Sequence, residues 1–209
     1  MAKAEENGYF YHRFDEVWNI QKKYVSDKTL DYIDGVADGA DVSPWRIGYM
    51  WIWEGVMYPM GCTSFAVEGL GTKSNNLIHV RSLDGHGYLE DPVTGIYAQE
   101  APVLVVCDPI EDFAFMYPSV AGYFVEDGIN ERGISVCNLW SVCSDNTLYG
   151  SPMGVRLFEA LYSSSNASQA IEIITSNNTF GYNFIVCDGQ KNDAYVIAVS
   201  YTHLTLPTN

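Results

Sequence analysis

The residue best suited to chemistry in this chain is Cys62, in the stretch Met-Gly-Cys-Thr-Ser-Phe at positions 60–65. A thiol is a strong nucleophile, but with an ordinary pKa of about 8.5 it is mostly protonated at neutral pH. Cleavage between Gly61 and Cys62 would free an α-amine with a pKa of about 8, which could act as general base. One residue would then supply nucleophile and base. The alternative is an inert, half-buried cysteine at the start of a β-strand.

Two asparagines interrupt runs that are otherwise apolar, Asn138 in "ISVCNLW" and Asn183 in "GYNFIVC". A buried carboxamide is unfavourable unless it is hydrogen-bonded. Each could donate to the oxygen of a tetrahedral intermediate, as in an oxyanion hole, or bond a neighbouring turn. Strand alternation would place Cys137 and Leu139 on the opposite, packed face from Asn138.

Four segments, in this order, resemble the autoproteolytic N-terminal-nucleophile (Ntn) hydrolases of the penicillin acyltransferase type. They are "GCTSF" at 61–65, "HVRSLDG" at 79–85, "GINERGISVCNLW" at 128–140 and "GYNFIVCDG" at 181–189. The resemblance runs from about residue 30 to 198, and bile salt hydrolases and phospholipase B-like proteins are more distant relatives. It implies an α+β, four-layer αββα sandwich, self-cleavage at Gly61–Cys62, and no cofactor. The catalytic residues that it implies are Cys62, Arg81, Asp84, Asn138 and Asn183.

The resemblance puts Arg81 and Asp84 beside Cys62. The permanent charge of Arg81 would favour the thiolate, and Asp84 would accept hydrogen bonds from the new ammonium group. Positions i and i+3 of a strand face opposite sides, so both can serve only if the chain turns at Leu83-Asp84-Gly85. The alternative is a surface salt bridge at the end of a strand.

The elements that must position these residues change in character at Cys62. Before it, apolar spacing of three and four predicts helix from Tyr9 to about Gly39, followed by a short helix and loop in "PWRIGYMWIWEGVMYPM". After it come short runs rich in β-branched and aromatic residues, which indicate an antiparallel meander. They are "TSFAVEG", "NNLIHVRSL", "APVLVVCDP", "DFAFMYPS" and "ISVCNLWSV". We expect "CTSFAVE" and "LIHVRSL" to pair as a hairpin through "GLGTKSNN".

Two further helices are predicted at about 152–162 and 167–175, with Asn166 as N-cap of the second, and then a hairpin of "GYNFIVCDG" with "DAYVIAVS". The domain organisation expected is a helical segment 1–61, an incomplete catalytic domain 62–198 and a tail 199–209. After cleavage, segment 1–61 would be retained as the second chain.

The composition excludes several partners. Eleven basic residues against 26 acidic ones leave a net charge of −15, which disfavours nucleic acid and anionic membrane surfaces. The five cysteines and four histidines show no ligand spacing, so we expect no metal. There is no signal peptide pattern and no apolar run long enough to span a membrane, which favours a cytoplasmic location.

The last stretch, "VSYTHLTLPTN" from Val199 to Asn209, resembles the translation of a sequencing adapter. We therefore expect the natural chain to continue past Ala198 and assign no role to His203. In the fold this stretch should be an unsupported extension of the strand "DAYVIAV" or a loose tail.

The activity that the resemblance implies is cleavage of a linear amide in a small acyl amide or acyl donor substrate, through a thioester on Cys62, with water or an amine as acceptor. Two alternatives remain. One is a phospholipase B-like ester hydrolase with the same nucleophile. The other is a non-catalytic, aromatic-rich binding domain in which Cys62 is structural.

Overall fold

Two stacked antiparallel sheets form the centre of the computed structural model, which describes residues 9–52, 61–84, 94–97, 100–141, 143–202 and 204–205. The small sheet is the hairpin of β1 (Gly61–Val67) and β2 (Ile78–Asp84), with the 3₁₀ turn η3 (Gly69–Gly71) in its connection. The large sheet is a meander in chain order. Its strands are β3 (Pro102–Cys107), β4 (Phe115–Val120), β5 (Asp127–Asn130), β6 (Ile134–Trp140), β7 (Tyr182–Asp188), β8 (Asp193–Val199) and β9 (Leu204–Thr205).

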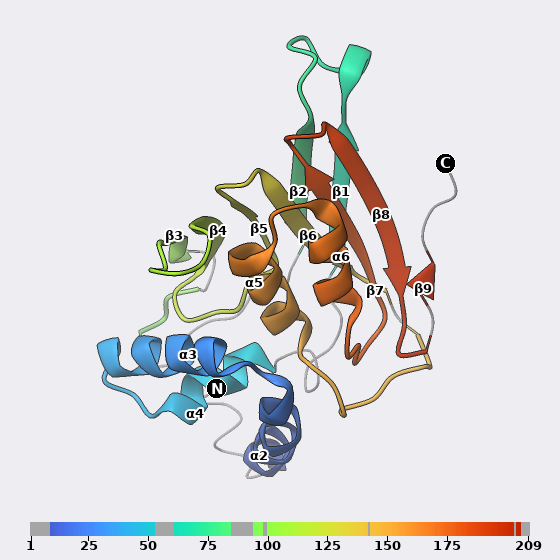
Figure 1. The fold of residues 1–209 in the computed structure, drawn as a ribbon. Helices are drawn as coiled ribbons and strands as arrows, with labels where there is room; N and C mark the ends of the chain where they lie inside the picture. The colour runs from blue at the N-terminus through green and yellow to red at the C-terminus, as the bar shows by residue number, and fades with distance from the viewer. Residues whose placement is uncertain are drawn as a thin grey trace.

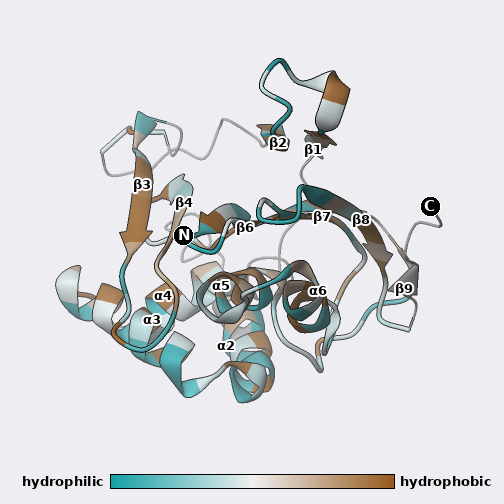
Figure 2. Ribbon diagram, turned by 45° about the horizontal axis from the view of Figure 1, so that its top comes forward, coloured by the Kyte–Doolittle hydropathy of each residue, from teal (hydrophilic) through white to brown (hydrophobic). Residues whose placement is uncertain are grey.

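Helices cover one face of the large sheet, and the β1–β2 hairpin lies against the other (Figures 1 and 2). The helices are α2 (Tyr9–Gln21), the 3₁₀ helix η1 (Lys22–Tyr24), α3 (Asp27–Gly39), α4 (Pro44–Trp51), α5 (Met153–Ser163) and α6 (Ala167–Thr175). Strand alternation divides β7 between the two layers. Tyr182, Phe184 and Val186 pack with the helices, whereas Ile185 and Cys187 pack with the hairpin.

Local hydrogen bonds set the helix boundaries. The Ser26 side chain accepts from the backbone N–H of Thr29 and begins α3, so the helix expected from Tyr9 to Gly39 is two helices with a break at 22–26. Asn166 caps α6 in the same way by accepting from the N–H of Gln169, as predicted. Pro44 occupies the first turn of α4, where its missing N–H removes no helical bond.

The turn between β5 and β6 ties the sheet to α5. The carboxamide of Asn130 donates to the carbonyls of Leu161 and Ser164 at the end of α5, at 2.9 and 2.8 Å. Its oxygen accepts from the backbone N–H of Arg132 and Ile134. Gly133 has a φ of +75°, a conformation that glycine adopts without strain. The "INERG" motif is therefore a structural anchor.

The α+β class and the stacked antiparallel sheets agree with the expectation from the sequence. Two details of the meander were wrong. β1 and β2 form their own sheet, and β5 was not anticipated as a strand. Within the residues that the structure describes, no helix covers the outer face of β1–β2, so three of the four layers of an αββα sandwich are seen.

The segment after Ala198 is hydrogen-bonded where the structure describes it. Val199 completes β8, and Leu204–Thr205 pairs back on Ala198 and Val199. The hydroxyls of Ser200 and Thr202 and the N–H of Thr202 donate to Asp145, at 2.7, 2.6 and 2.8 Å. The expected unsupported extension or loose tail is thus not what these residues form. The origin of the segment stays a prediction, and His203 lies outside the described residues.

Candidate active site

The β1–β2 hairpin brings Cys62 and Arg81 together. Its register pairs Cys62 with Leu83 and Ser64 with Arg81, so these four side chains share one face of the hairpin. Cys62, Ser64 and Arg81 are partly buried, whereas their neighbours in sequence are exposed. The hairpin expected from the sequence is therefore confirmed, and Arg81 lies where the Ntn resemblance implies.

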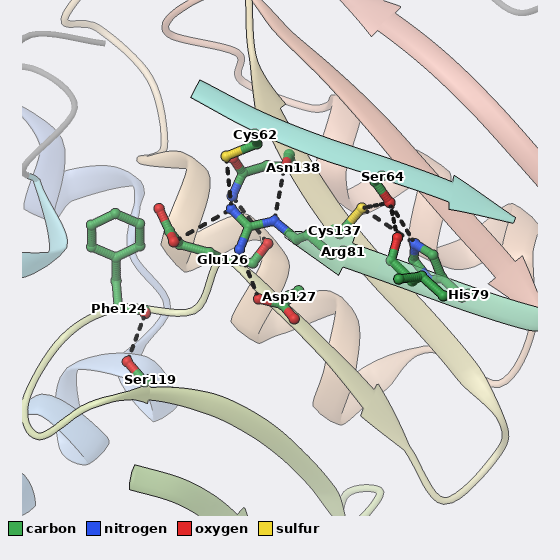
Figure 3. A network of polar contacts seen from close by, with 11 residues as sticks. Cys62, Ser64, His79, Arg81, Ser119, Phe124, Glu126, Asp127, Cys137 and Asn138 are labelled. Atoms are coloured by element: carbon green, nitrogen blue, oxygen red, sulfur yellow. Dashed lines mark hydrogen bonds and ion pairs between the residues drawn. The ribbon is translucent and has the colours of Figure 1, made fainter. Parts of the chain in front are cut away.

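The Arg81 guanidinium is the centre of the site (Figure 3). Its Nη2 donates to Cys62 Sγ at 3.1 Å, and its Nε donates to the backbone carbonyl of Asn138 at 3.2 Å. Its Nη1 lies 3.0 Å from Asp127 Oδ1, and its Nη2 lies 3.4 Å from Glu126 Oε2. The Arg81 side chain is only 5% exposed, so its charge is compensated by two carboxylates rather than by water.

These surroundings determine the protonation of the thiol. Burial raises the pKa of Cys62 above its ordinary value, and the positive charge of Arg81 opposes that rise only in part. Burial also acts to lower the pKa of Arg81, but Glu126 and Asp127 outweigh it and the pKa is raised. The guanidinium is thus permanently charged and the thiol is protonated at neutral pH. A proton acceptor is needed before Cys62 can attack a carbonyl.

Sequence reasoning missed the acidic pair Glu126 and Asp127. Burial raises the pKa of both carboxyl groups, and the charge of Arg81 opposes the rise in each. A signal was present, because "YFVEDGI" places two carboxylates in an apolar run and a buried cation needs a carboxylate partner. The third segment that carries the Ntn resemblance begins at Gly128, directly after this pair.

Asp84 does not face the thiol. β2 continues through Leu83 to Asp84, so Arg81 and Asp84 lie on opposite faces, as alternation over three residues requires. Gly85, the last residue of the expected turn, lies outside the described residues. The Asp84 carboxylate accepts from Thr63 and Ser82 on the exposed face, at 3.3 and 2.9 Å. Its backbone, not its carboxylate, forms a hydrogen bond with the Cys62 thiol. The expected side-chain contact is therefore corrected.

Asn138 is near Arg81 through its backbone only. Its side chain alternates with Cys137 and Leu139, which pack toward the hairpin, so it belongs to the helix-covered face of β6. It is 3% exposed, and its Nδ2 donates to the carbonyl of Glu126 at 3.0 Å. That carbonyl also accepts from the Asn138 backbone N–H. The carboxamide thus holds the loop that carries Glu126.

Asn183 lies on the face of the large sheet that meets the hairpin. It pairs with Leu139 and alternates with Tyr182 and Phe184, so it shares its face with Ile185. It is partly buried, unlike its fully buried neighbours. Of the two asparagines, Asn183 is the one on the side of the sheet where Cys62 lies.

A second polar cluster joins the two sheets next to the site (Figure 3). His79 lies 2.8 Å from Ser135 Oγ through Nδ1 and 3.3 Å from Cys137 Sγ through Nε2. Ser64 Oγ is 3.3 Å from His79 Nε2 and accepts from the Cys137 thiol at 3.2 Å. Burial, and then Arg81, lower the pKa of His79. The cluster is therefore neutral and fixes β1 and β2 against β6.

A cavity of about 350 Å³ opens beside the guanidinium, between β2 and the large sheet. Arg81, Asp127 and His79 are among its polar lining residues, and Leu104, Met116 and Ile129 are among its apolar ones. No group of three or more His, Cys, Asp or Glu side chains that could hold a metal ion occurs among the described residues. No described helix is long and apolar enough to cross a membrane.

No protein-family model and no curated protein sequence matches the chain. Among solved structures, it is similar to the Caenorhabditis elegans N-acylethanolamine-hydrolyzing acid amidase (NAAA) ortholog, with a TM-score of 0.50 and 14% identity over 71% of this chain and 64% of that one. This similarity shows the fold, which is that of the Ntn hydrolases, as the sequence resemblance implied.

Two further solved structures are similar over comparable shares of the chain. Penicillin V acylase from Agrobacterium tumefaciens has a TM-score of 0.49 and 14% identity, over 69% of this chain and 48% of that one. A mutant of conjugated bile acid hydrolase from Clostridium perfringens has a TM-score of 0.46 and 15% identity, over 72% and 51%. The chain therefore spans between 48% and 64% of the length of the three proteins.

Proposed function

We propose that this protein is a cysteine Ntn hydrolase that cleaves itself between Gly61 and Cys62 and then cleaves a linear amide through a thioester on Cys62. The observation that carries the proposal is the buried guanidinium of Arg81, which lies 3.1 Å from the Cys62 thiol. Ion pairs with Glu126 and Asp127 compensate its positive charge. The Ntn-hydrolase fold supports the proposal, and the Caenorhabditis elegans protein of similar structure is an N-acylethanolamine-hydrolyzing acid amidase ortholog.

Self-cleavage begins with attack of Cys62 Sγ on the carbonyl carbon of Gly61. The peptide nitrogen leaves as the free α-amine of Cys62, and water hydrolyses the resulting thioester to a carboxylate on Gly61. Packing does not itself require glycine at this position. An added Cβ would make only ordinary contacts with Asp84, at 3.6 Å or more. The value of glycine lies in the room that it leaves for the thiol to reach the carbonyl.

In the amide reaction the new α-amine accepts the thiol proton, and the sulfur attacks the substrate carbonyl. The positive charge of Arg81 stabilises the thiolate that forms in its partly buried position. The substrate nitrogen departs as an amine with the proton. Water then releases the acid from the thioester, or a second amine takes the acyl group.

The acyl group fits the cavity beside Arg81. Leu104, Met116 and Ile129 line it with apolar side chains, and Arg81 and Asp127 are among its charged lining residues. An acyl chain placed there would have its carbonyl near the guanidinium and Cys62. We therefore propose an N-acyl amide with an apolar acyl group as substrate.

Intact-mass measurement and N-terminal sequencing of the purified protein test the proposal. We expect a second chain that begins Cys-Thr-Ser-Phe, and hydrolysis of an N-acyl amide by the cut protein. Cys62→Ala should stay in one piece and be inactive, whereas Cys143→Ala, at a partly buried cysteine outside the site, should be cut normally. Amide hydrolysis by an uncut protein, or by Cys62→Ala, would contradict the mechanism.

A further inference from the structure

A second cavity, of about 680 Å³, lies on the helix-covered side of the large sheet, the opposite side from Cys62. Its lining residues come from the first turns of α3, the turn between β3 and β4, and α5. None of its residues belongs to the Cys62 site. The proposal made here is therefore independent of the proposed amide cleavage.

The floor of this cavity is aromatic. The ring of Phe158 packs against Tyr32, Phe115 and Tyr162, with centroid distances of 4.7, 5.1 and 5.7 Å. The hydroxyl of Tyr32 is held by Tyr117 at 2.8 Å. The rings are thus fixed by mutual packing. Aromatic rings attract cations placed over their faces, and of these four rings Tyr32 and Tyr162 are partly exposed whereas Phe115 and Phe158 are buried.

The rim of the cavity is acidic. Four carboxylates line it against one described lysine; they are Asp31, Asp108, Glu111 and Asp112, and the lysine is Lys28. In a protein with a net charge of −15, this rim adds a local negative potential. It repels fatty acids and other anions that an apolar floor would otherwise hold.

Lys28 shows how the cavity holds a cation. Its ammonium lies 2.6 Å from Asp112 Oδ2 and 5.9 Å from the centroid of the Tyr162 ring. An ammonium group is thus already placed between a carboxylate and an aromatic ring. The Lys28 side chain is 57% exposed, so its ion pair with Asp112 contributes little free energy and a ligand can displace the ammonium group.

From these observations we propose that this cavity binds a small organic ammonium compound, whose cationic head takes the place of the Lys28 ammonium and whose apolar part rests on the aromatic floor. Carboxylates and rings together favour an ammonium group with methyl or methylene substituents over a bare metal ion. The electrostatic attraction of the ring faces acts on a cation and is absent for a neutral ligand.

Titration of the full chain with choline, followed by calorimetry or by NMR, tests the proposal. The matched probe is 3,3-dimethylbutan-1-ol, which has the shape of choline without its charge. We expect saturable choline binding, and binding of the neutral alcohol at least about tenfold weaker. Equal binding of the two probes, or no saturable binding of choline, would overturn the proposal.

Two pairs of variants separate this site from general attraction by an acidic protein. Asp31→Asn, at the rim, should weaken choline binding several-fold, whereas Asp34→Asn, one turn further along α3 and outside the lining, should not. Lys28→Met should strengthen binding because it removes the competing ammonium, whereas Lys22→Met should leave it unchanged. Equal effects within either pair would show that charge alone attracts the probe and would refute the site.

Discussion

At the scale of single residues, the site depends on how one buried arginine is compensated. The Arg81 guanidinium contacts Cys62, Asp127, Glu126 and the carbonyl of Asn138, so all three of its nitrogens are occupied. Burial raises the pKa of the Cys62 thiol despite this neighbour. The geometry therefore suits a nucleophile that is deprotonated only during the reaction, by a base such as its own α-amine.

The two candidate oxyanion donors should separate on substitution. Asn183→Ala should reduce amide turnover on the order of a hundredfold with little loss of stability, because Asn183 lies on the face of the sheet that meets the hairpin. Asn138→Ala should instead lower the free energy of unfolding by about 1–3 kcal/mol, because it removes a buried hydrogen bond to the Glu126 carbonyl.

Turnover per folded molecule and urea unfolding of both variants measure the two effects. Asn183→Asp, which replaces the donor with a carboxylate, is the control for a donor role. Full turnover in Asn183→Ala, together with a stable but slow Asn138→Ala, would assign the oxyanion role to Asn138 instead.

At the scale of elements, the β1–β2 hairpin depends on its contacts with β6 for its position. The cluster of Ser64, His79, Ser135 and Cys137 joins the two sheets two residues away from Arg81. His79 and Arg81 are on the same face of β2. Loss of the hydrogen bonds between His79 and β6 would therefore also shift the Arg81 guanidinium.

His79 should make stability depend on pH. Burial and Arg81 lower its pKa in the folded state below the unfolded value of about 6.5. Below that pH, His79 is therefore protonated more readily in the unfolded chain than in the folded one. The contribution of His79 is thus complete above about pH 6.5 and is lost as the pH falls below it. His79→Gln, which keeps a hydrogen-bonding side chain, should remove this loss.

Urea unfolding of both proteins at about pH 7.5 and pH 5.5 measures the effect, with the difference between the proteins as the readout. The raised pKa values of Glu126 and Asp127 make their contribution to stability grow as the pH falls, the opposite of the His79 effect. Both proteins contain these two carboxyl groups, so the difference between the proteins isolates His79. A difference that is the same at both pH values would show that His79 does not titrate differently on folding.

At the scale of the whole molecule, the outer face of the hairpin is apolar and exposed. Phe65 and Val80 are directly paired across β1 and β2 and are 49% and 40% exposed, and Ile78 lies beside them. No described helix covers this face (Figure 2). An uncovered apolar sheet surface of this kind promotes association.

Phe65→Thr combined with Val80→Thr should therefore reduce self-association while leaving the hairpin intact, since threonine is well accepted in strands. Light scattering over a range of protein concentrations measures association, and circular dichroism verifies the fold. Ser82→Thr on the same face of β2 is the control and should change nothing. Unchanged association of the double variant would mean that another surface is responsible.

Much of the fold follows from local patterns. The hairpin of 61–67 with 78–84, the helices α5 and α6 and the Asn166 cap are all readable from alternation, spacing and capping residues. β5 was not predicted from the sequence because "DGIN" is four residues long and rich in turn formers. The break before α3 was not predicted because the apolar spacing typical of a helix continues across Ser26. The side chain of Ser26 caps the new helix.

For the site, the sequence alone was enough to single out Cys62 by its thiol chemistry and context and Arg81 by the Ntn resemblance, and the register of the hairpin places both on one face. Only the tertiary structure decided that Glu126 and Asp127 compensate Arg81, that the carboxamide of Asn138 turns toward the helices, and that Asp84 faces outward. The physical reason is range. Alternation and capping act over a few residues, whereas the stacking of one sheet on another and the burial of a charge depend on segments far apart in the chain.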